Sequence, residues 1–285
     1  MTTMLPLLVS RSGTGPLPGQ TVPDVPPAAR HGRLRESSAG GGPDWSAWVD
    51  YFEANAATQR RLEDCIDWGA EPTLSPAQER RWVSSLQRFQ LGESGDGAHL
   101  LRHVHRGDDR GFVPAAKAFV AEERGHARLL RVLLARFGAA PMEAHWSDGA
   151  FVAARRCMGV ATELAVIAVA EAVAVVYYGR LADGAPDPVI RGVARRILSD
   201  ELGHLPLVES RIAVDLARWG GVRRALLRGL WWAAGVGGTA VLALDHGAVL
   251  ADCGEGRWAG VRAAWRSVRD VRHSTYARAG MICTR

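Results

Sequence analysis

Two short segments of this chain share one pattern, an acidic pair followed by a histidine three residues after the second acid. They are residues 122–126, EERGH, and residues 200–204, DELGH. Residues three apart share one face of an α-helix, so the glutamate and the histidine of each segment can bind the same metal ion. A single Glu-x-x-His segment is more often a surface charge pair. Two of them, each within a stretch of helical pattern, favour a metal site inside a helical bundle.

A bundle site of this kind also needs a carboxylate from each of two further helices. Glu93 lies 30 residues before Glu123, and Glu171 lies 30 residues before Glu201. The two halves are therefore a repeated helical hairpin with a constant offset of 78 residues, and each half supplies one glutamate plus Glu-x-x-His. Four carboxylates and two imidazoles suit two iron or manganese ions. The predicted ligands are Glu93, Glu123, His126, Glu171, Glu201 and His204.

Glu171 lies in an apolar run, VIAVAEAVAV, that has no nearby cation in the sequence. A buried, unpaired carboxylate is costly, so this side chain should be paired, protonated or metal-bound, and we favour metal binding. Glu163 is a rival that lies eight residues earlier, about 12 Å along the helix axis and roughly 80° around it. We assign Glu163 a role beside the metals or in a cavity, and whether it is a direct ligand stays open.

Tyr178 shares the face of Glu171, either as a core aromatic or as a hydrogen-bond donor.

The chain from Leu74 onward has the pattern of long helices. Residues 75–78, SPAQ, supply an N-cap, a proline at the first helical position and a capping-box glutamine. An earlier helix should begin near Asp44. The later helices are predicted over about 75–105, 111–137, 148–182, 187–219, 222–250 and 257–276. We therefore expect an all-α fold, a four-helix bundle with extra N- and C-terminal helices.

Three regions are expected along the chain. The first is rich in proline, glycine and serine, and it cannot bury much apolar surface. The second carries the predicted ligands, and the third follows a Gly-Gly pair. The boundaries are a disordered arm at 1–43, the helical bundle at 44–220 and a C-terminal helical extension packed on the bundle at 221–285.

Charge, cysteines and hydropathy narrow the class of protein. The net charge is +5, but no block of five or six like charges is present, which argues against a nucleic-acid partner. The four cysteines are scattered without a CxxC pair and the start lacks a basic region, so we expect reduced thiols and a cytoplasmic location. The apolar stretches 157–178 and 226–250 contain acids or glycines, and we expect packed helices there rather than stable membrane spans.

The other histidines and the glycines of the two motifs carry weaker signals. The remaining seven histidines receive no ligand role, because none of them forms a convincing ligand pair on a predicted helix face. His246 is the one that could still face the site, since it follows an aspartate in an apolar region. Gly125 and Gly203 weaken their helices, and they could admit close helix packing or a cavity beside the metals.

The paired Glu-x-x-His helices resemble the ferritin-like di-iron carboxylate superfamily. The segments SLQRFQLGESGDGAHLL, FVAEERGHARLL, AEAVAVVYYGRL and ILSDELGH are similar, more specifically, to bacterial ferritin-like proteins of the oxygenase/desaturase type. The resemblance covers about residues 44–215 and implies a ferritin-like four-helix bundle with the six residues above as ligands. It also implies that Glu123 and Glu201 bridge the metals and that Glu122 and Asp200 orient the histidines. Solvent-facing acids or arginine pairs are the alternative for these last two.

The motif and the resemblance together predict an O2-activating di-iron oxidoreductase: a hydroxylase, N-oxygenase, desaturase or oxidative-cleavage enzyme. Its cofactors would be two Fe ions, with Mn/Fe or Mn/Mn pairs left open, and O2 would be the co-substrate. Its partners would be a small or carrier-protein-tethered organic substrate and an electron donor such as a ferredoxin or a reductase, and a homodimer is left open. One alternative is ferritin- or rubrerythrin-like iron oxidation or peroxide detoxification, although a rubrerythrin usually has a CxxC site. The other is a non-catalytic scaffold or membrane-surface protein.

Overall fold

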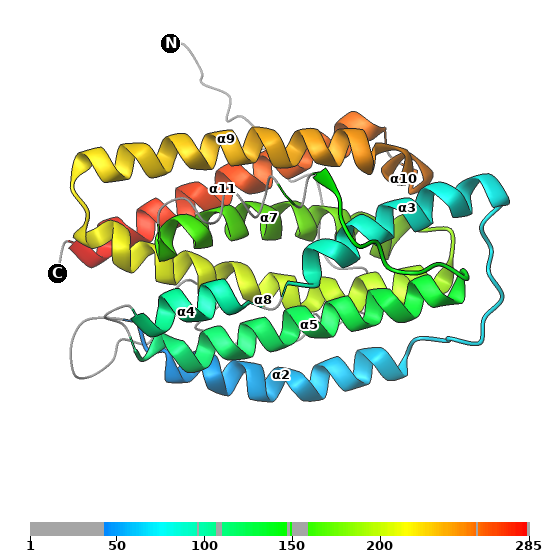
Figure 1. The fold of residues 1–285 in the computed structure, drawn as a ribbon, viewed down its shortest axis with the longest axis horizontal. Coiled ribbons are helices and arrows are strands. Elements are labelled where there is room, and N and C mark those ends of the chain that lie inside the picture. The colour runs from blue at the N-terminus through cyan, green and yellow to red at the C-terminus, as the bar shows by residue number, and fades with distance from the viewer. Residues whose placement is uncertain are drawn as a thin grey trace, which may run out of the picture.

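The computed structural model of this chain describes residues 43–95, 97–106, 110–146, 149, 159–254 and 256–283. These residues form an all-α protein, as predicted, whose long helices lie side by side (Figure 1). The expected disordered arm falls outside the described residues except for its last residue. The fold is therefore set by how the helices bury their apolar faces against one another.

Four helices carry the predicted ligands. α7 packs extensively against α8, α3 packs against α5, and α5 also contacts α8. α7 is apolar nearly all round, which suits the centre of a bundle. The bounds of these helices are Pro76–Glu93 for α3, Phe112–Arg136 for α5, Val160–Gly184 for α7 and Pro188–Arg218 for α8.

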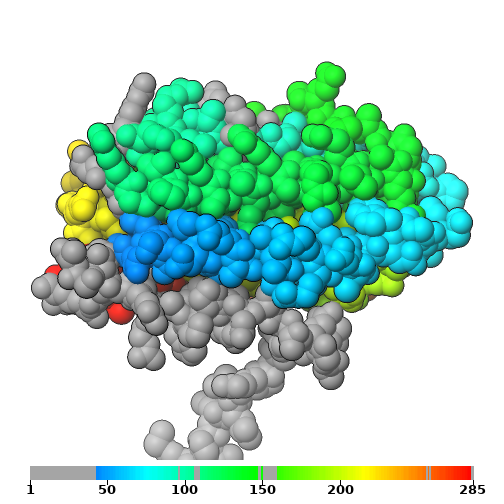
Figure 2. Space-filling view, turned by 90° about the horizontal axis from the view of Figure 1, so that it is seen from below, coloured from blue at the N-terminus to red at the C-terminus, as the bar shows by residue number. Residues whose placement is uncertain are grey.

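A further helix, α2 (Ser46–Asp64), packs against both α5 and α8. Figure 2 shows α2 in blue along one face of the molecule, beside the green α5. Its inward side carries Trp48, Tyr51, Phe52 and Asn55, all buried. Three of these are aromatic, and the fourth is the polar residue that reaches the site described below.

The helix predicted over 75–105 is interrupted, which corrects the sequence-based expectation. Its start is as predicted, because Ser75 and Gln78 form the capping box. However, α3 ends at Glu93, and a separate helix, α4 (Ala98–Arg106), follows. The chain turns at Gly97, whose φ is 65° and whose position would bring a Cβ within 2.5 Å of Val120. Only glycine adopts that backbone conformation without strain and fits the space.

Other predicted boundaries also change, including the C-terminal end of the last helix, which runs to Cys283 rather than to 276. α7 begins at Val160, after Gly159 with a φ of 89°, so the helix predicted over 148–182 is not continuous at this point; its predicted start lies outside the described part, as do residues 147–148 and 150–158. The helix predicted over 222–250 is divided at His246, whose ring is hydrogen-bonded to Ser85. The C-terminal helices are α9 (Gly221–Asp245), α10 (Gly247–Asp252) and α11 (Arg257–Cys283).

The helices after α8 pack on the bundle. α11 contacts α7, α8 and α9, and α9 contacts α7. Within the described part of the chain, two helices, α7 and α9, are long and apolar enough to cross a membrane by length and composition. They differ in burial: 78% of the most apolar window of α7 is buried, against 28% for α9.

Candidate metal centre

The structure brings the six predicted ligands together inside the bundle, one carboxylate from each of α3 and α7 and a Glu-x-x-His pair from each of α5 and α8. Their ligand atoms form two groups, and within each group these atoms lie within 4.8 Å of one another. Glu123 and Glu201 belong to both groups. The first group is Glu93, Glu123, His126 and Glu201, and the second is Glu123, Glu171, Glu201 and His204.

The first group is centred on His126, which is fully buried. Its Nδ1 atom lies 3.6 Å from Glu93 Oε2, 3.6 Å from Glu123 Oε1 and 3.3 Å from Glu201 Oε1. These spacings resemble the distances between ligands that surround one ion, since each ligand atom lies about 2.0–2.2 Å from a bound transition metal. The Glu-x-x-His spacing therefore does place its two donors around one point.

The second group repeats this arrangement around His204, which is also fully buried. Its Nδ1 atom lies 3.1 Å from Glu123 Oε1, 3.5 Å from Glu171 Oε2 and 3.6 Å from Glu201 Oε2. The imidazole centroids of the two histidines are 5.6 Å apart. Two ions held this way would share the two glutamates that both groups contain.

Several buried polar atoms inside the two groups lack a hydrogen-bond partner, which favours a metal site. Buried polar atoms are normally hydrogen-bonded, and each exception needs an explanation. Five atoms at the interior of the two groups have no hydrogen-bond partner among the described residues, and metal ions fit these lone pairs. The atoms are Glu123 Oε1, His126 Nδ1, Glu171 Oε2, Glu201 Oε2 and His204 Nδ1.

The opposite nitrogen of each histidine has an acidic partner from the other hairpin. His126 Nε2 lies 3.0 Å from Asp200 Oδ2, and His204 Nε2 lies 3.0 Å from Glu122 Oε2. A carboxylate that accepts from Nε2–H leaves Nδ1 as a lone-pair donor, which is the arrangement typical of metal-bound histidine. Glu122 and Asp200 are thus placed to orient the histidines, as the resemblance implied, and the pairing crosses from one hairpin to the other.

Residues of α2 complete this outer layer, and the sequence analysis missed them. The Asn55 amide donates to Glu122 at 2.9 Å and to Asp200 at 2.8 Å. Gln59, one helical turn later, also donates to both carboxylates. Two amides four residues apart share one helix face, and this spacing was the available signal.

The electrostatics of the centre reflect many carboxylates in a buried space. Burial, together with the charge of Glu123, raises the pKa of the Glu93 carboxyl to about 7. Burial and the charge of Glu201 raise the pKa of Glu171 well above its ordinary value. Burial alone would lower the pKa of His126 and His204, but the surrounding carboxylates outweigh it and raise both well above 6.5. Bound cations would supply the positive charge that these carboxylates need.

Two further contacts fix the geometry of the centre. The Tyr178 hydroxyl donates to Glu93 Oε1 at 3.0 Å. Of the two roles predicted for this buried tyrosine, the structure therefore shows the hydrogen-bond donor. A Cβ at position 203 would lie 2.0 Å from the Tyr51 hydroxyl oxygen. Gly203 therefore admits close packing of α2 against α8, whereas nothing lies within 4 Å of a Cβ at Gly125.

Glu163 is not part of either group of ligands. Its carboxylate instead faces His99 and His103 of α4, two histidines to which the sequence analysis gave no ligand role. His246 also lies elsewhere, hydrogen-bonded to Ser85 and packed against Phe89. Burial lowers the pKa of His246 to about 3, so its ring is neutral at ordinary pH.

Fold and site together define a class: an all-α protein whose buried glutamate and histidine clusters could hold metal ions. Comparison of the chain with protein-family models, curated proteins and solved structures gives no match. Any narrower assignment must therefore come from the geometry of the site.

Proposed function

We propose that this protein is an O2-activating di-iron oxidoreductase built on a ferritin-like bundle. One observation carries the proposal: two groups of four buried ligand atoms share Glu123 and Glu201, and each group adds its own histidine and its own further glutamate. Carboxylate-rich sites with few histidines suit iron and manganese better than softer sites do.

The residues that would hold each ion follow from the two groups. Glu93 and His126 would hold one ion, Glu171 and His204 would hold the other, and the two shared glutamates could serve both. Two iron ions, when bound, would supply the electrons and open coordination positions that O2 activation requires. Mn/Fe and Mn/Mn pairs fit the same ligands.

The chain itself contributes orientation, charge and exclusion of water. Asp200 and Glu122 accept from the Nε2 atoms and hold the two imidazoles in place. Apolar side chains of α7 on both sides of Glu171, such as Ala168 and Ala172, are fully buried and keep this carboxylate away from bulk water. A dry and preorganised site is what the protein adds to metal chemistry.

An oxygenase or oxidase of this type also needs a substrate and a source of electrons. We propose a small or carrier-protein-tethered organic substrate, an electron donor such as a ferredoxin or a reductase, and a cytoplasmic location. The related activity of iron oxidation or peroxide detoxification uses the same ligands, and it differs in needing no organic substrate.

The proposal is tested by metal content and by rapid mixing with O2. Protein produced with ample iron should contain about two iron ions per chain, with any other metal counted separately. On mixing with O2, the ferrous form should develop the absorption of oxidised iron. His126→Ala and His204→Ala should each lose iron and this absorption while remaining folded by circular dichroism. His105→Ala is the matched control, because His105 is exposed on α4 and bonds only to the Leu101 carbonyl among the described residues.

The outcomes separate the alternatives. Zinc in place of iron, or an absorption that persists in both histidine variants, would contradict the di-iron assignment. Rapid consumption of hydrogen peroxide, or continued turnover of added ferrous iron without an organic substrate, would favour the detoxification or iron-oxidation role instead.

A further inference from the structure

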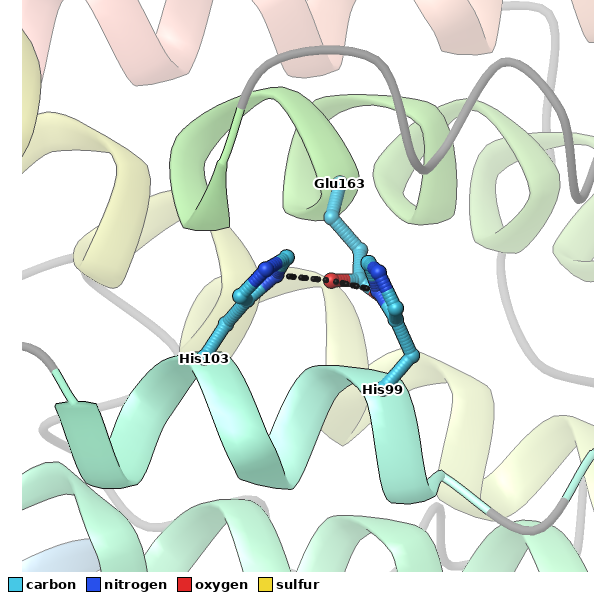
Figure 3. A group of neighbouring side chains, drawn as sticks. All are labelled: His99, His103 and Glu163. Carbon is cyan, nitrogen blue, oxygen red and sulfur yellow. Dashed lines mark hydrogen bonds and ion pairs between the residues drawn. The ribbon is translucent and has the colours of Figure 1, made fainter.

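A separate group of metal-ligand residues lies on α4 and α7. His99 and His103 are four residues apart on α4, so their side chains share one face of that helix. That face points at the first turn of α7, where Glu163 is fully buried. Figure 3 shows both imidazole rings directed at the same oxygen of the Glu163 carboxylate.

The spacing of these three ligand atoms is slightly shorter than the spacing around a bound zinc ion. His99 Nδ1 lies 2.9 Å from Glu163 Oε2, and His103 Nδ1 lies 3.2 Å from the same oxygen. Ligands about 2.0–2.1 Å from a tetrahedral zinc ion are separated from one another by roughly 3.3 Å. A small outward movement of the side chains would therefore admit an ion between them.

We propose that His99, His103 and Glu163 form a third, mononuclear metal position that binds a divalent transition-metal ion such as Zn²⁺. Two imidazoles and one carboxylate are a ligand set that zinc uses with water in its fourth position. The His99 and His103 side chains are 19% and 28% exposed, so water can reach the ion. The ion at this position should therefore exchange with solution more readily than ions at the buried dinuclear centre.

This position is distinct from the dinuclear centre. None of its three residues belongs to either of the two groups that share Glu123 and Glu201. Glu163 and Glu171 are both on α7, but eight residues separate them, which is about 12 Å along a helix. The third position therefore stands whether or not the dinuclear centre binds iron or reacts with O2.

The break between α3 and α4 is what creates this site. If the helix predicted over 75–105 were continuous, α4 would extend along the axis of α3. Instead, Gly97 turns the chain, and α4 packs against both α5 and α7. The His-x-x-x-His spacing is present in the sequence, but its carboxylate partner becomes visible only in three dimensions.

Zinc titration of the iron-loaded protein tests the proposal. Wild-type protein should bind one Zn²⁺ per chain by isothermal titration calorimetry. His99→Ala, His103→Ala and Glu163→Gln should each weaken this affinity by more than about 100-fold, because losing a ligand costs more than losing an outer partner, which costs about 10–100-fold. His105→Ala, on the same helix but outside the cluster, should bind zinc as the wild type does, and the iron content should stay the same in all five proteins.

Unchanged zinc affinity in the two histidine variants would overturn the proposal, as would the absence of zinc binding to the wild type. Loss of dinuclear iron in Glu163→Gln would also overturn it, by placing Glu163 in the iron site. If Glu163→Gln fails to fold, the two histidine variants carry the test, since their side chains are partly exposed. If the protein takes up no iron, the proposed function fails. The third metal position is still tested in that case, because wild-type protein should bind one zinc ion more than His99→Ala.

Discussion

The two halves of the proposed dinuclear centre have matching candidate ligands but different surroundings. Glu93 is the last residue of α3, and its carboxylate accepts a hydrogen bond from Tyr178. Glu171 lies in the middle of the apolar helix α7, and its Oε2 has no hydrogen-bond partner among the described residues. The repeat therefore duplicates the metal donors without duplicating the groups that control them, and the two ions should not be equivalent.

The outer partners of the histidines show the same asymmetry. Asp200, which faces His126, forms an ion pair with Arg196. Burial alone would raise the pKa of Asp200, but His126 and Arg196 hold it below its ordinary value. Glu122, which faces His204, receives amide hydrogen bonds from Asn55 and Gln59, and no arginine ion pair with it is found in the described part of the chain. The negative charge behind His126 is thus better compensated than the charge behind His204.

The largest effect should come from removing the unshared glutamates one at a time. Glu93→Ala should leave mainly the ion beside His204, and Glu171→Ala mainly the ion beside His126, so the iron content should fall from about two to about one per chain in each. Mössbauer spectra of the two variants should differ, since the remaining ions have different surroundings. Glu163→Ala is the control and should keep both irons. If either Glu93→Ala or Glu171→Ala keeps two ions, the glutamate that it removes is not a ligand.

A smaller effect should follow from changing the charge behind one histidine. Arg196→Gln removes the cation beside Asp200, and we expect a loss of about 10–100-fold in iron affinity, as is typical for groups that support a metal ligand. The loss should be confined to the ion beside His126. Asn55→Ala is the symmetric comparison, because this amide contacts both outer carboxylates. Equal losses at both ions in Arg196→Gln would remove the proposed asymmetry.

The pH dependence of the metal-free protein should report the crowded carboxylates. Glu93 has a pKa of about 7 in the folded protein, above its ordinary 4.5, and His126 and His204 are raised well above 6.5. The folded state then binds more protons than the unfolded chain, so the free energy of unfolding falls as the pH rises. Glu93 causes this fall between about pH 4.5 and 7, and the two histidines cause it above pH 6.5. Thermal unfolding should give a lower Tm at pH 8.5 than at pH 6. Glu93→Gln should flatten the part of this slope below pH 7, and a Tm that rises with pH would contradict the interpretation.

The smallest effect is expected at Tyr178. Tyr178→Phe removes the hydroxyl that donates to Glu93, and one such hydrogen bond contributes about 1 kcal/mol, or roughly fivefold in affinity. Iron titration should detect this loss at the ion beside His126 and none at the other. Tyr177→Phe is a close control, since the Tyr177 hydroxyl is paired with Ser85 instead.

The sequence predicted the parts of the site that depend on spacing within one helix. The four candidate glutamates and two histidines come together because residues three apart share a helix face and because the two hairpins have the same length. The capping box at Ser75 is also a local pattern, and it is present. Whether these six residues bind metal stays a prediction.

What the sequence did not predict depends on contacts between distant helices. The turn at Gly97 requires a positive φ next to Val120, which no local pattern indicates. Asn55 reaches the site only because α2 packs across α5 and α8. His99 and His103 have ligand spacing, but without the turn their partner Glu163 could not be identified.

The place of α2 in the chain has a consequence for how the protein is assembled. The hydrogen bond from Asn55 to Asp200 spans 145 residues. A ribosome adds about 5–20 residues each second, so α2 is complete roughly 7–30 s before its partner on α8 has been synthesised. During that interval Asn55 can pair only with Glu122 of the first hairpin, which still lacks the second shared glutamate and the second histidine. The proposed paired site can therefore form only after the chain has been synthesised as far as His204, with 81 residues still to follow.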